Sequence, residues 1–253
     1  MSAVNIKNLD SSKYNNLKNR HLNPNLPKAP YRGIFVGSSN AGKTNLLCNL
    51  LLRDDFAYDK IYIICPNVNI QPKYLMLKDI FEKVDENVKK DTMKKVNEYN
   101  KKHKVEVDPE SIDLDPIAEF MEDIPSDLLG RLDESKMNLI VLDDLVLADK
   151  QQQKIIDSLF IRGRHSNASV LQLCQSFYRA SRISRLQCNL FILLHSTNRS
   201  ELTKLHKECG LNVNKNEFCD VIMKELEKPY SFVVGDLDSS VPWRKSDFTQ
   251  PLF

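Results

Sequence analysis

The chain has 253 residues, of which 42% are hydrophobic and 28% are charged. This composition is that of an ordinary globular protein, and it excludes a collagen-like, coiled-coil or wholly disordered chain. Because a single core rarely grows beyond about 250 residues, we expect one large α/β domain or two small ones. The apolar runs are far shorter than the ~18 residues of a membrane span and no secretory signal is present, so we expect a soluble intracellular protein.

The charge is spread unevenly along the chain. The formal net charge is only +2, but residues 1–32 carry six basic residues against one acidic residue, a net charge of +5. Residues 105–149 carry fourteen acidic against two basic residues (−12), and residues 151–210 carry nine basic against three acidic residues (+6). We expect faces of opposite sign, one of which could follow a phosphate backbone; the alternative is ordinary solvated surface charge.

An N-terminal arm precedes the expected folded domain. Residues 1–30 hold seven Asn before position 26 and prolines at 24, 27 and 30, with little apolar periodicity. This composition predicts a flexible arm that is loose until it docks. Residues 31–253 are expected to form the domain.

Short apolar strands alternate with helical stretches through the domain. Strands are expected at residues 31–36, 60–65, 138–142, 169–174 and 189–194, and a helix at residues 44–53. Residues 71–136 are charged, then acidic and proline-containing, and predict a helical insertion above the sheet. The alternation predicts a mainly parallel sheet with helices on both faces, and residues 230–234 and the tail from Trp243 are expected to add to its edge.

A phosphate-binding loop follows the first strand. The pattern G-x-x-x-x-G-K-[ST] is matched in full by eight consecutive residues: Gly37, Ser38, Ser39, Asn40, Ala41, Gly42, Lys43 and Thr44. Glycines let backbone N–H groups converge on phosphate oxygens at a helix N-terminus, whose dipole favours anions. Lys43 is then expected to bind the β and γ phosphates and Thr44 to bind Mg²⁺, which predicts ATP as the ligand.

Two carboxylates follow the strand at residues 138–142. A buried strand would deliver Asp143 and Asp144 to the edge of the sheet where α/β proteins bind ligands, as the Walker B motif does. We expect Asp143 to bind Mg²⁺ and Asp144 to deprotonate the attacking water. The alternative is that Asp144 caps the following segment. Many related hydrolases have the longer Glu at this position.

Polar and basic residues surround the next strand. Gln175 follows the strand at residues 169–174 and is expected to sense the γ phosphate, or else to solvate a loop. Arg162 and Arg164 precede that strand, and either could reach a neighbouring subunit's triphosphate as an arginine finger or bind DNA phosphate. Three further arginines are spaced three apart and would share one face of a helix over residues 177–186, where we expect DNA contacts: Arg179, Arg182 and Arg185.

The runs GSSNAGKT, LIVLDDL, RGRHSNASVLQLCQS and NLFILL resemble the genome-packaging ATPases of large eukaryotic DNA viruses and virophages, within the FtsK/HerA superfamily of P-loop NTPases. The resemblance covers roughly residues 30–250, and its most discriminating part is the RGRH run before a strand that ends in Gln. It implies that Lys43 and Asp144 are catalytic, that Arg164 is the finger and that Gln175 is the sensor.

The same resemblance implies the partners and the location. Members of this family are expected to form an oligomeric ring that threads double-stranded DNA into a preformed capsid and contacts a capsid vertex component. It places the protein at the viral assembly site in a host cell, and in or on the virion. It implies no membrane partner.

Two other functions remain open on the residues alone. One is a small phosphotransferase, such as a nucleoside kinase, in which Lys43 and nearby arginines assist transfer of the γ phosphoryl group to a small acceptor molecule. The other is an assembly factor that binds ATP with little turnover. DNA-stimulated hydrolysis distinguishes them, because only a translocase should be accelerated by long duplex DNA.

Overall fold

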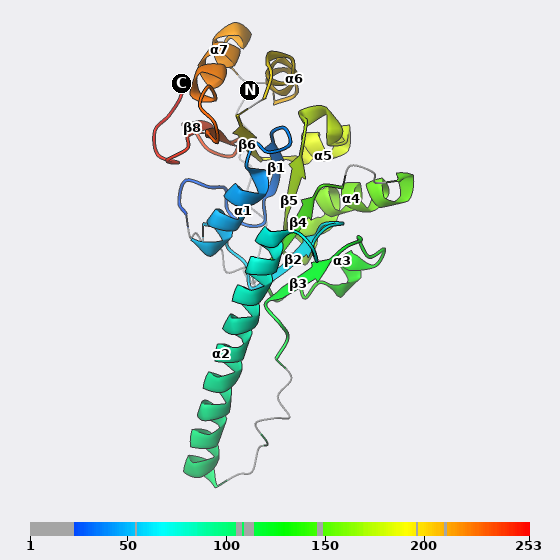
Figure 1. Cartoon of the computed structure of the whole chain (residues 1–253), viewed down its shortest axis with the longest axis vertical. Coiled ribbons are helices and arrows are strands. Elements are labelled where there is room, and N and C mark those ends of the chain that lie inside the picture. The colour runs from blue at the N-terminus through cyan, green and yellow to red at the C-terminus, as the bar shows by residue number, and fades with distance from the viewer. Residues whose placement is uncertain are drawn as a thin grey trace, which may run out of the picture.

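A single mixed sheet forms the centre of the fold. The computed structural model describes residues 23–53, 55–104, 108, 114–145, 149–195, 197–209 and 212–253. Within these residues eight strands pair in the order β3-β2-β4-β5-β1-β6-β7-β8 (Figure 1). Their bounds are β1 (Arg32–Val36), β2 (Lys60–Ile64), β3 (Ala118–Met121), β4 (Asn138–Asp143), β5 (Ala168–Cys174), β6 (Leu190–Leu194), β7 (Phe232–Asp236) and β8 (Trp243–Lys245).

The first six strands in this spatial order, from β3 at the edge through β2, β4, β5 and β1 to β6, run parallel to one another. β7 pairs with β6 and β8 with β7 in the antiparallel sense, which confirms the expected addition at the edge. Every residue of β2, β4, β5 and β6 is buried, as strands covered on both faces should be. The carboxyl ends of the parallel strands therefore share one edge, where α/β sheets bind ligands.

Helices cover both faces of the sheet. One face packs against α1 (Lys43–Leu52) and the start of α2 (Pro72–His103), with Leu47, Leu50 and Leu77 in the core. The other face packs against α3 (Leu128–Arg131), α4 (Lys150–Arg162), the 3-10 turn η3 (Phe177–Arg179), α6 (Arg199–Cys209) and α7 (Lys215–Glu225). The 3-10 turn η2 (Gly163–Ser166) follows α4 directly, and α5 (Arg182–Gln187) packs against α4 and α6. The expected parallel sheet between two helical layers is confirmed.

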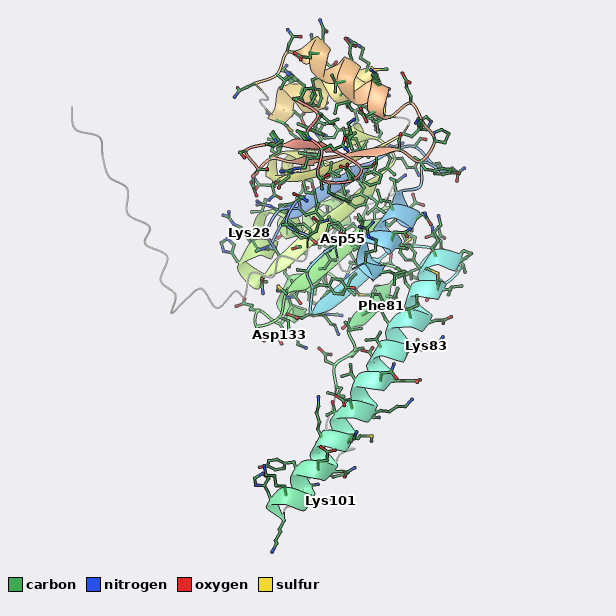
Figure 2. All side chains as sticks on the ribbon, turned by 90° about the vertical axis from the view of Figure 1, so that its left-hand side faces the viewer. Lys28, Asp55, Phe81, Lys83, Lys101 and Asp133 are labelled. Atoms are coloured by element: carbon green, nitrogen blue, oxygen red, sulfur yellow. The ribbon has the colours of Figure 1, made fainter. Side chains whose placement is uncertain are left out.

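Helix α2 leaves the body of the domain after its first turns. Its buried residues are Tyr74, Leu77 and Phe81, and beyond Phe81 the helix projects away from the sheet (Figure 2). Residues 71–104 carry ten Lys and six acidic residues. None of the helices that the structure describes is both long and apolar enough to cross a membrane.

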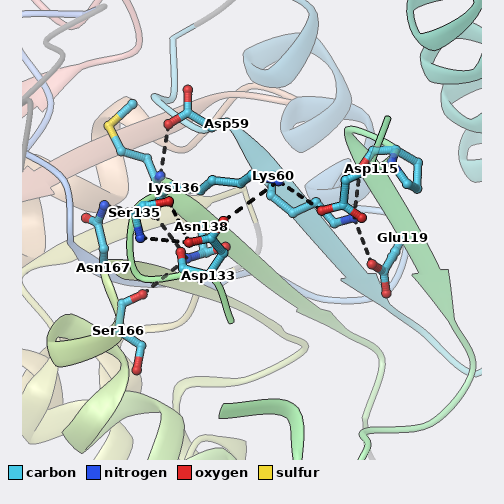
Figure 3. Close-up of polar contacts among 12 residues, drawn as sticks. Asp59, Lys60, Asp115, Glu119, Asp133, Ser135, Lys136, Asn138, Ser166 and Asn167 are labelled. Carbon is cyan, nitrogen blue, oxygen red and sulfur yellow. Dashed lines mark hydrogen bonds and ion pairs between the residues drawn. The ribbon is translucent and has the colours of Figure 1, made fainter. Parts of the chain in front are cut away.

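The segment expected to be a helical insertion also supplies a strand. β3 pairs with β2 at the edge of the sheet, and ion pairs anchor it there (Figure 3). The Lys60 ammonium, on β2, lies 2.8 Å from Glu119 and 3.3 Å from Asp115, and it donates a hydrogen bond to the Pro116 carbonyl. Because Lys60 is buried, these carboxylates neutralise a charge that burial would otherwise make costly. The acidic character of this segment therefore serves the fold.

The folded body begins before Tyr31. Leu26 and Ala29 are 3% and 8% exposed and belong to the core on the α1 face. The Asn23 amide donates to Asp55 over 2.8 Å. The last residues of the expected arm are therefore packed, whereas residues 1–22 lie outside the described residues and their flexibility stays a prediction.

Candidate functional site

The loop between β1 and α1 has the backbone of a phosphate cradle. Asn40 and Gly42 have φ angles of 65° and 95°, in the left-handed region. A Cβ on Gly37 would lie 2.9 Å from the Leu194 Cβ and 3.0 Å from the Ala41 Cβ, so no side chain fits there. These two glycines let the loop turn tightly before α1 begins at Lys43.

Lys43 folds back into this loop. Its ammonium donates hydrogen bonds to the carbonyls of Gly37 at 2.7 Å and Ser38 at 3.0 Å. Burial lowers the pKa of the ammonium, and the nearby Asp143 carboxylate acts in the opposite direction. The charge is thus held inside the loop, where the phosphates of a nucleotide would lie.

Asp143, at the end of β4, connects the two sequence motifs. Its Oδ2 accepts hydrogen bonds from the Thr44 hydroxyl at 3.0 Å and from the Tyr74 hydroxyl at 2.6 Å. Burial raises the pKa of this carboxyl, while the hydrogen bonds from Tyr74 and Thr44 and the charge of Lys43 lower it. A carboxylate beside a threonine hydroxyl is an oxygen donor set that suits Mg²⁺, so these residues fit the ion that the motifs imply.

Tyr74 is a site residue that the sequence analysis missed. It lies in the first turn of α2, is fully buried, and its contact with Asp143 spans 69 positions of the chain. Burial and the adjacent Asp143 raise the pKa of its phenol well above the ordinary value, so it stays a hydrogen-bond donor at neutral pH. No local motif marks such a residue.

Asp144 and Gln175 meet at the mouth of the same cavity. The Gln175 amide donates to Asp144 Oδ1 over 3.2 Å, across the ends of the neighbouring strands β4 and β5. The cap of α4 is Asp149, whose carboxylate accepts from two backbone N–H groups, so Asp144 does not cap that helix. The cavity measures about 430 Å³ and is lined by Ser39, Asn40, Gly42, Lys43, Thr44, Cys65, Asn67, Ile70, Gln71, Lys73, Asp143, Asp144, Leu173 and Gln175.

Arg164 lies far from this cavity in its own chain. It sits in η2, at the start of β5, whereas Gln175 follows the end of that strand. The 7 residues of β5 span about 23 Å at ~3.3 Å per residue. Arg162 and Arg164 are both exposed, and neither forms an ion pair with the residues that the structure describes. An active role for Arg164 therefore requires a second subunit, and it stays a prediction.

The expected DNA-contact helix over residues 177–186 is not continuous. The chain forms η3, then turns, and α5 starts at Arg182 with Ser181 as its cap. Arg185 is 7% exposed, and its guanidinium binds Glu208 at 2.7 and 3.0 Å. The prediction that Arg185 contacts DNA is wrong, because this arginine is occupied by a buried ion pair.

Arg182 instead lines a basic groove between α5 and α6. The groove is a cavity of about 620 Å³ whose cations are Arg182, Lys204 and Lys207. The Lys204 ammonium lies 4.3 Å from the centroid of the Tyr178 ring. Glu208 is the acidic residue in the described lining; it binds Arg185 at 2.7 Å and lies 3.9 Å from the Lys204 ammonium. Arg179 is exposed and lines a separate cavity of about 100 Å³ that also includes Gln175.

The chain is similar to known proteins both in sequence profile and in fold. The profile of the family described as Poxvirus A32 protein matches residues 18–236. The fold is similar to that of the genome packaging NTPase B204 from Sulfolobus turreted icosahedral virus 2. For its complex with AMPPCP the TM-score is 0.50 at 15% identity, over 85% of this chain and 95% of that one. For the complex with AMP the TM-score is 0.51 at 16% identity, over 85% and 96%.

A further solved structure shares the fold, and no curated protein sequence matches the chain. VirB4 of Thermoanaerobacter pseudethanolicus gives a TM-score of 0.52 at 12% identity, over 81% of this chain and 86% of that one. At these identities the structural likeness establishes the fold alone. The match of the family profile covers most of the chain.

Proposed function

Because the chain belongs to the poxvirus A32 protein family, we propose that it is a genome-packaging ATPase that drives double-stranded DNA into a preformed capsid. The observation that carries the ATPase is a single cavity that holds Lys43, Thr44, Asp143, Asp144 and Gln175. The Sulfolobus virus protein of similar fold is a genome packaging NTPase seen with AMPPCP and with AMP, which supports a nucleotide as the ligand.

These five residues of the cavity have distinct chemical roles in hydrolysis. The backbone N–H groups of the loop and the Lys43 ammonium hold the β and γ phosphates. Thr44 and Asp143 hold Mg²⁺, which when bound neutralises developing charge on the phosphate oxygens. Asp144 accepts the proton of the attacking water, and Gln175, bound to Asp144, registers whether the γ phosphate is present. Tyr74 orients the Asp143 carboxylate through its hydrogen bond.

Arg164 acts in trans within an oligomeric ring. It is exposed at the edge of the sheet opposite the nucleotide cavity, so it is free to face a neighbouring subunit. A guanidinium supplied by a neighbour stabilises the charge of the transferred phosphoryl group and couples hydrolysis to assembly. Arg162 is the alternative finger.

DNA is contacted through phosphates rather than through bases. A translocase must step along any sequence, and phosphate contacts carry no sequence information. The basic groove offers Arg182, Lys204 and Lys207 for this purpose, on the same face of the sheet as η3, which closely follows Gln175. The protein also contacts a component of the capsid vertex and acts at the viral assembly site.

The proposal is tested by measuring ATP hydrolysis with long duplex DNA, with short duplex DNA and without DNA. We expect long duplexes to accelerate release of inorganic phosphate the most. Transfer of labelled γ phosphate to a nucleoside would support the phosphotransferase instead, and ATP binding without turnover would support the assembly factor.

Variants of the basic groove test the DNA contact. Arg182→Gln combined with Lys207→Gln should flatten the dependence of DNA affinity on salt, by about one unit of slope for each phosphate that is no longer neutralised. Lys215→Gln combined with Lys224→Gln removes two exposed lysines of α7 and is the matched control. Equal effects of the two pairs would place the DNA contact elsewhere.

A further inference from the structure

A second cavity adjoins the phosphate-binding loop on the side away from Asp144. It measures about 300 Å³, and Gly42 lines both cavities. In the first cavity Asp144 and Gln175 fix the end where the γ phosphate reacts. Because Gly42 lines both cavities, a nucleotide whose phosphates lie in the first cavity can extend past Gly42 into this second one, which we call the nucleoside cavity.

One wall of the nucleoside cavity is a polar face of α1. Asn45, Asn49 and Arg53 line it and are spaced four residues apart, so they stack on one side of the helix. Asn45 and Asn49 are exposed, and the Asn49 amide donates to the Asn45 carbonyl over 2.8 Å. The Arg53 guanidinium is paired with Asp55 at 3.2 Å, so the groups that this wall offers to the polar edges of a base and a ribose are the amides of Asn45 and Asn49.

The opposite wall carries an exposed tyrosine in an unusual backbone conformation. Tyr230 is 73% exposed and has a φ of 63°. It is the third residue of a turn closed by the Ser231 N–H on the Lys228 carbonyl at 3.1 Å, with Pro229 in second position. With φ > 0 this third position favours Gly or Asn, and a bulky aromatic residue there is strained.

The Tyr230 ring contributes little buried surface to the packing of the fold. Most of the ring is in solvent, while its edge approaches the loop, 3.2 Å from where a Cβ of Gly42 would lie. Strain without compensating burial is typical of residues that act on a ligand. An aromatic ring beside a phosphate loop offers a face on which a nucleobase can stack.

We propose that the nucleoside cavity binds the base and ribose of the triphosphate, with the base stacked on Tyr230. Asn45 and Asn49 then face the polar edge of the base from α1. This inference rests on the proposed function, because it assigns the part of the substrate that the phosphate loop does not hold.

The test compares a ligand that has a base with one that lacks it. ATP and inorganic tripolyphosphate are titrated by calorimetry into the wild type and into Tyr230→Ala, Tyr230→Phe and Tyr230→Gly. We expect Tyr230→Ala and Tyr230→Gly to weaken ATP binding about 5- to 150-fold, the range for the loss of one base–aromatic stack. Tripolyphosphate should bind all of them within about twofold of wild type, and Tyr230→Phe should bind ATP within about threefold, because the ring alone carries the stack.

Two further measurements keep the test decisive. Tyr99→Ala removes a tyrosine of α2 that is 53% exposed and distant from the loop, and should change neither affinity. Because glycine suits the left-handed position, Tyr230→Gly should melt no lower than wild type, which separates a loss of stacking from a loss of folding.

Unchanged ATP affinity in Tyr230→Ala and Tyr230→Gly would overturn the inference. So would an equal loss of ATP and tripolyphosphate affinity, because the turn would then only support the loop. Failure of the wild type to hydrolyse ATP would count against the proposed function, whereas the affinity ratio between the two ligands tests the nucleoside cavity by itself.

Discussion

Replacement of Tyr74 by Phe tests whether the hydrogen bond to Asp143 organises the site. The substitution removes one buried hydroxyl and leaves the ring, so it creates no large cavity. The bond is 2.6 Å long and joins a neutral donor to a carboxylate, and a hydrogen bond to a charged group contributes about 1.5–3 kcal/mol. We therefore expect the free energy of unfolding to fall by about 1.5–3 kcal/mol at neutral pH.

The loss should depend on pH in a defined direction. Burial raises the folded-state pKa of Asp143 above its ordinary value of 3.8, so its ionisation costs stability as the pH rises through the folded-state pKa. The Tyr74 bond opposes that rise, and without it the pKa climbs further. The difference between variant and wild type should grow as the pH rises through the folded-state pKa and Asp143 ionises, and shrink as the pH falls toward 3.8, where only a neutral hydrogen bond is removed.

Urea denaturation followed by circular dichroism, repeated at several pH values, measures both the free energy of unfolding and its dependence on pH. The same substitution in an Asp143→Asn background is the control, because the carboxylate is then absent; there Tyr74→Phe should cost about 0.5–1.5 kcal/mol. We also expect a higher Mg²⁺ concentration for half-maximal hydrolysis in Tyr74→Phe, because Asp143 is less well oriented. Equal losses in both backgrounds, or no loss at neutral pH, would refute the coupling between Tyr74 and Asp143.

Three further substitutions test the other roles. Lys43→Ala should abolish ATP hydrolysis and weaken binding, because a main positive charge on the phosphates is removed; rates within about twofold of wild type would refute the site. Asp144→Asn should keep ATP binding and lower kcat by about 10²-fold or more, and an unchanged rate would exclude a base. Arg164→Ala should be inactive alone but regain activity when mixed with Lys43→Ala, since hybrid interfaces pair an intact loop with an intact finger. A mixture that co-assembles and stays inactive would assign the finger to Arg162 or leave both arginines to DNA.

The sequence predicts those parts of the site that depend on contiguous residues. The loop from Gly37 to Thr44 and the pair Asp143–Asp144 each follow a short buried strand, and parallel pairing brings these strand ends to one edge. Gln175 could be placed for the same reason, because its strand lies beside β4.

The missed features depend on contacts between distant segments. Tyr74 reaches Asp143 across 69 positions, and nothing near Tyr74 signals a partner. β3 has four half-buried residues in an acidic segment, too short for a periodic pattern to identify, and Lys60 on β2 helps to hold it. Arg185 looked like a surface arginine because Glu208, which neutralises it, is 23 positions away.

The central claim, that ATP hydrolysis in this cavity moves the protein along DNA, is tested most directly by displacement of a triplex-forming strand from one end of a long duplex. We predict that the wild type displaces the third strand with ATP, more slowly as the distance to the triplex grows, and not with a non-hydrolysable analogue. Lys43→Ala should displace nothing. DNA-stimulated ATP hydrolysis by the wild type without displacement of the third strand would contradict translocation.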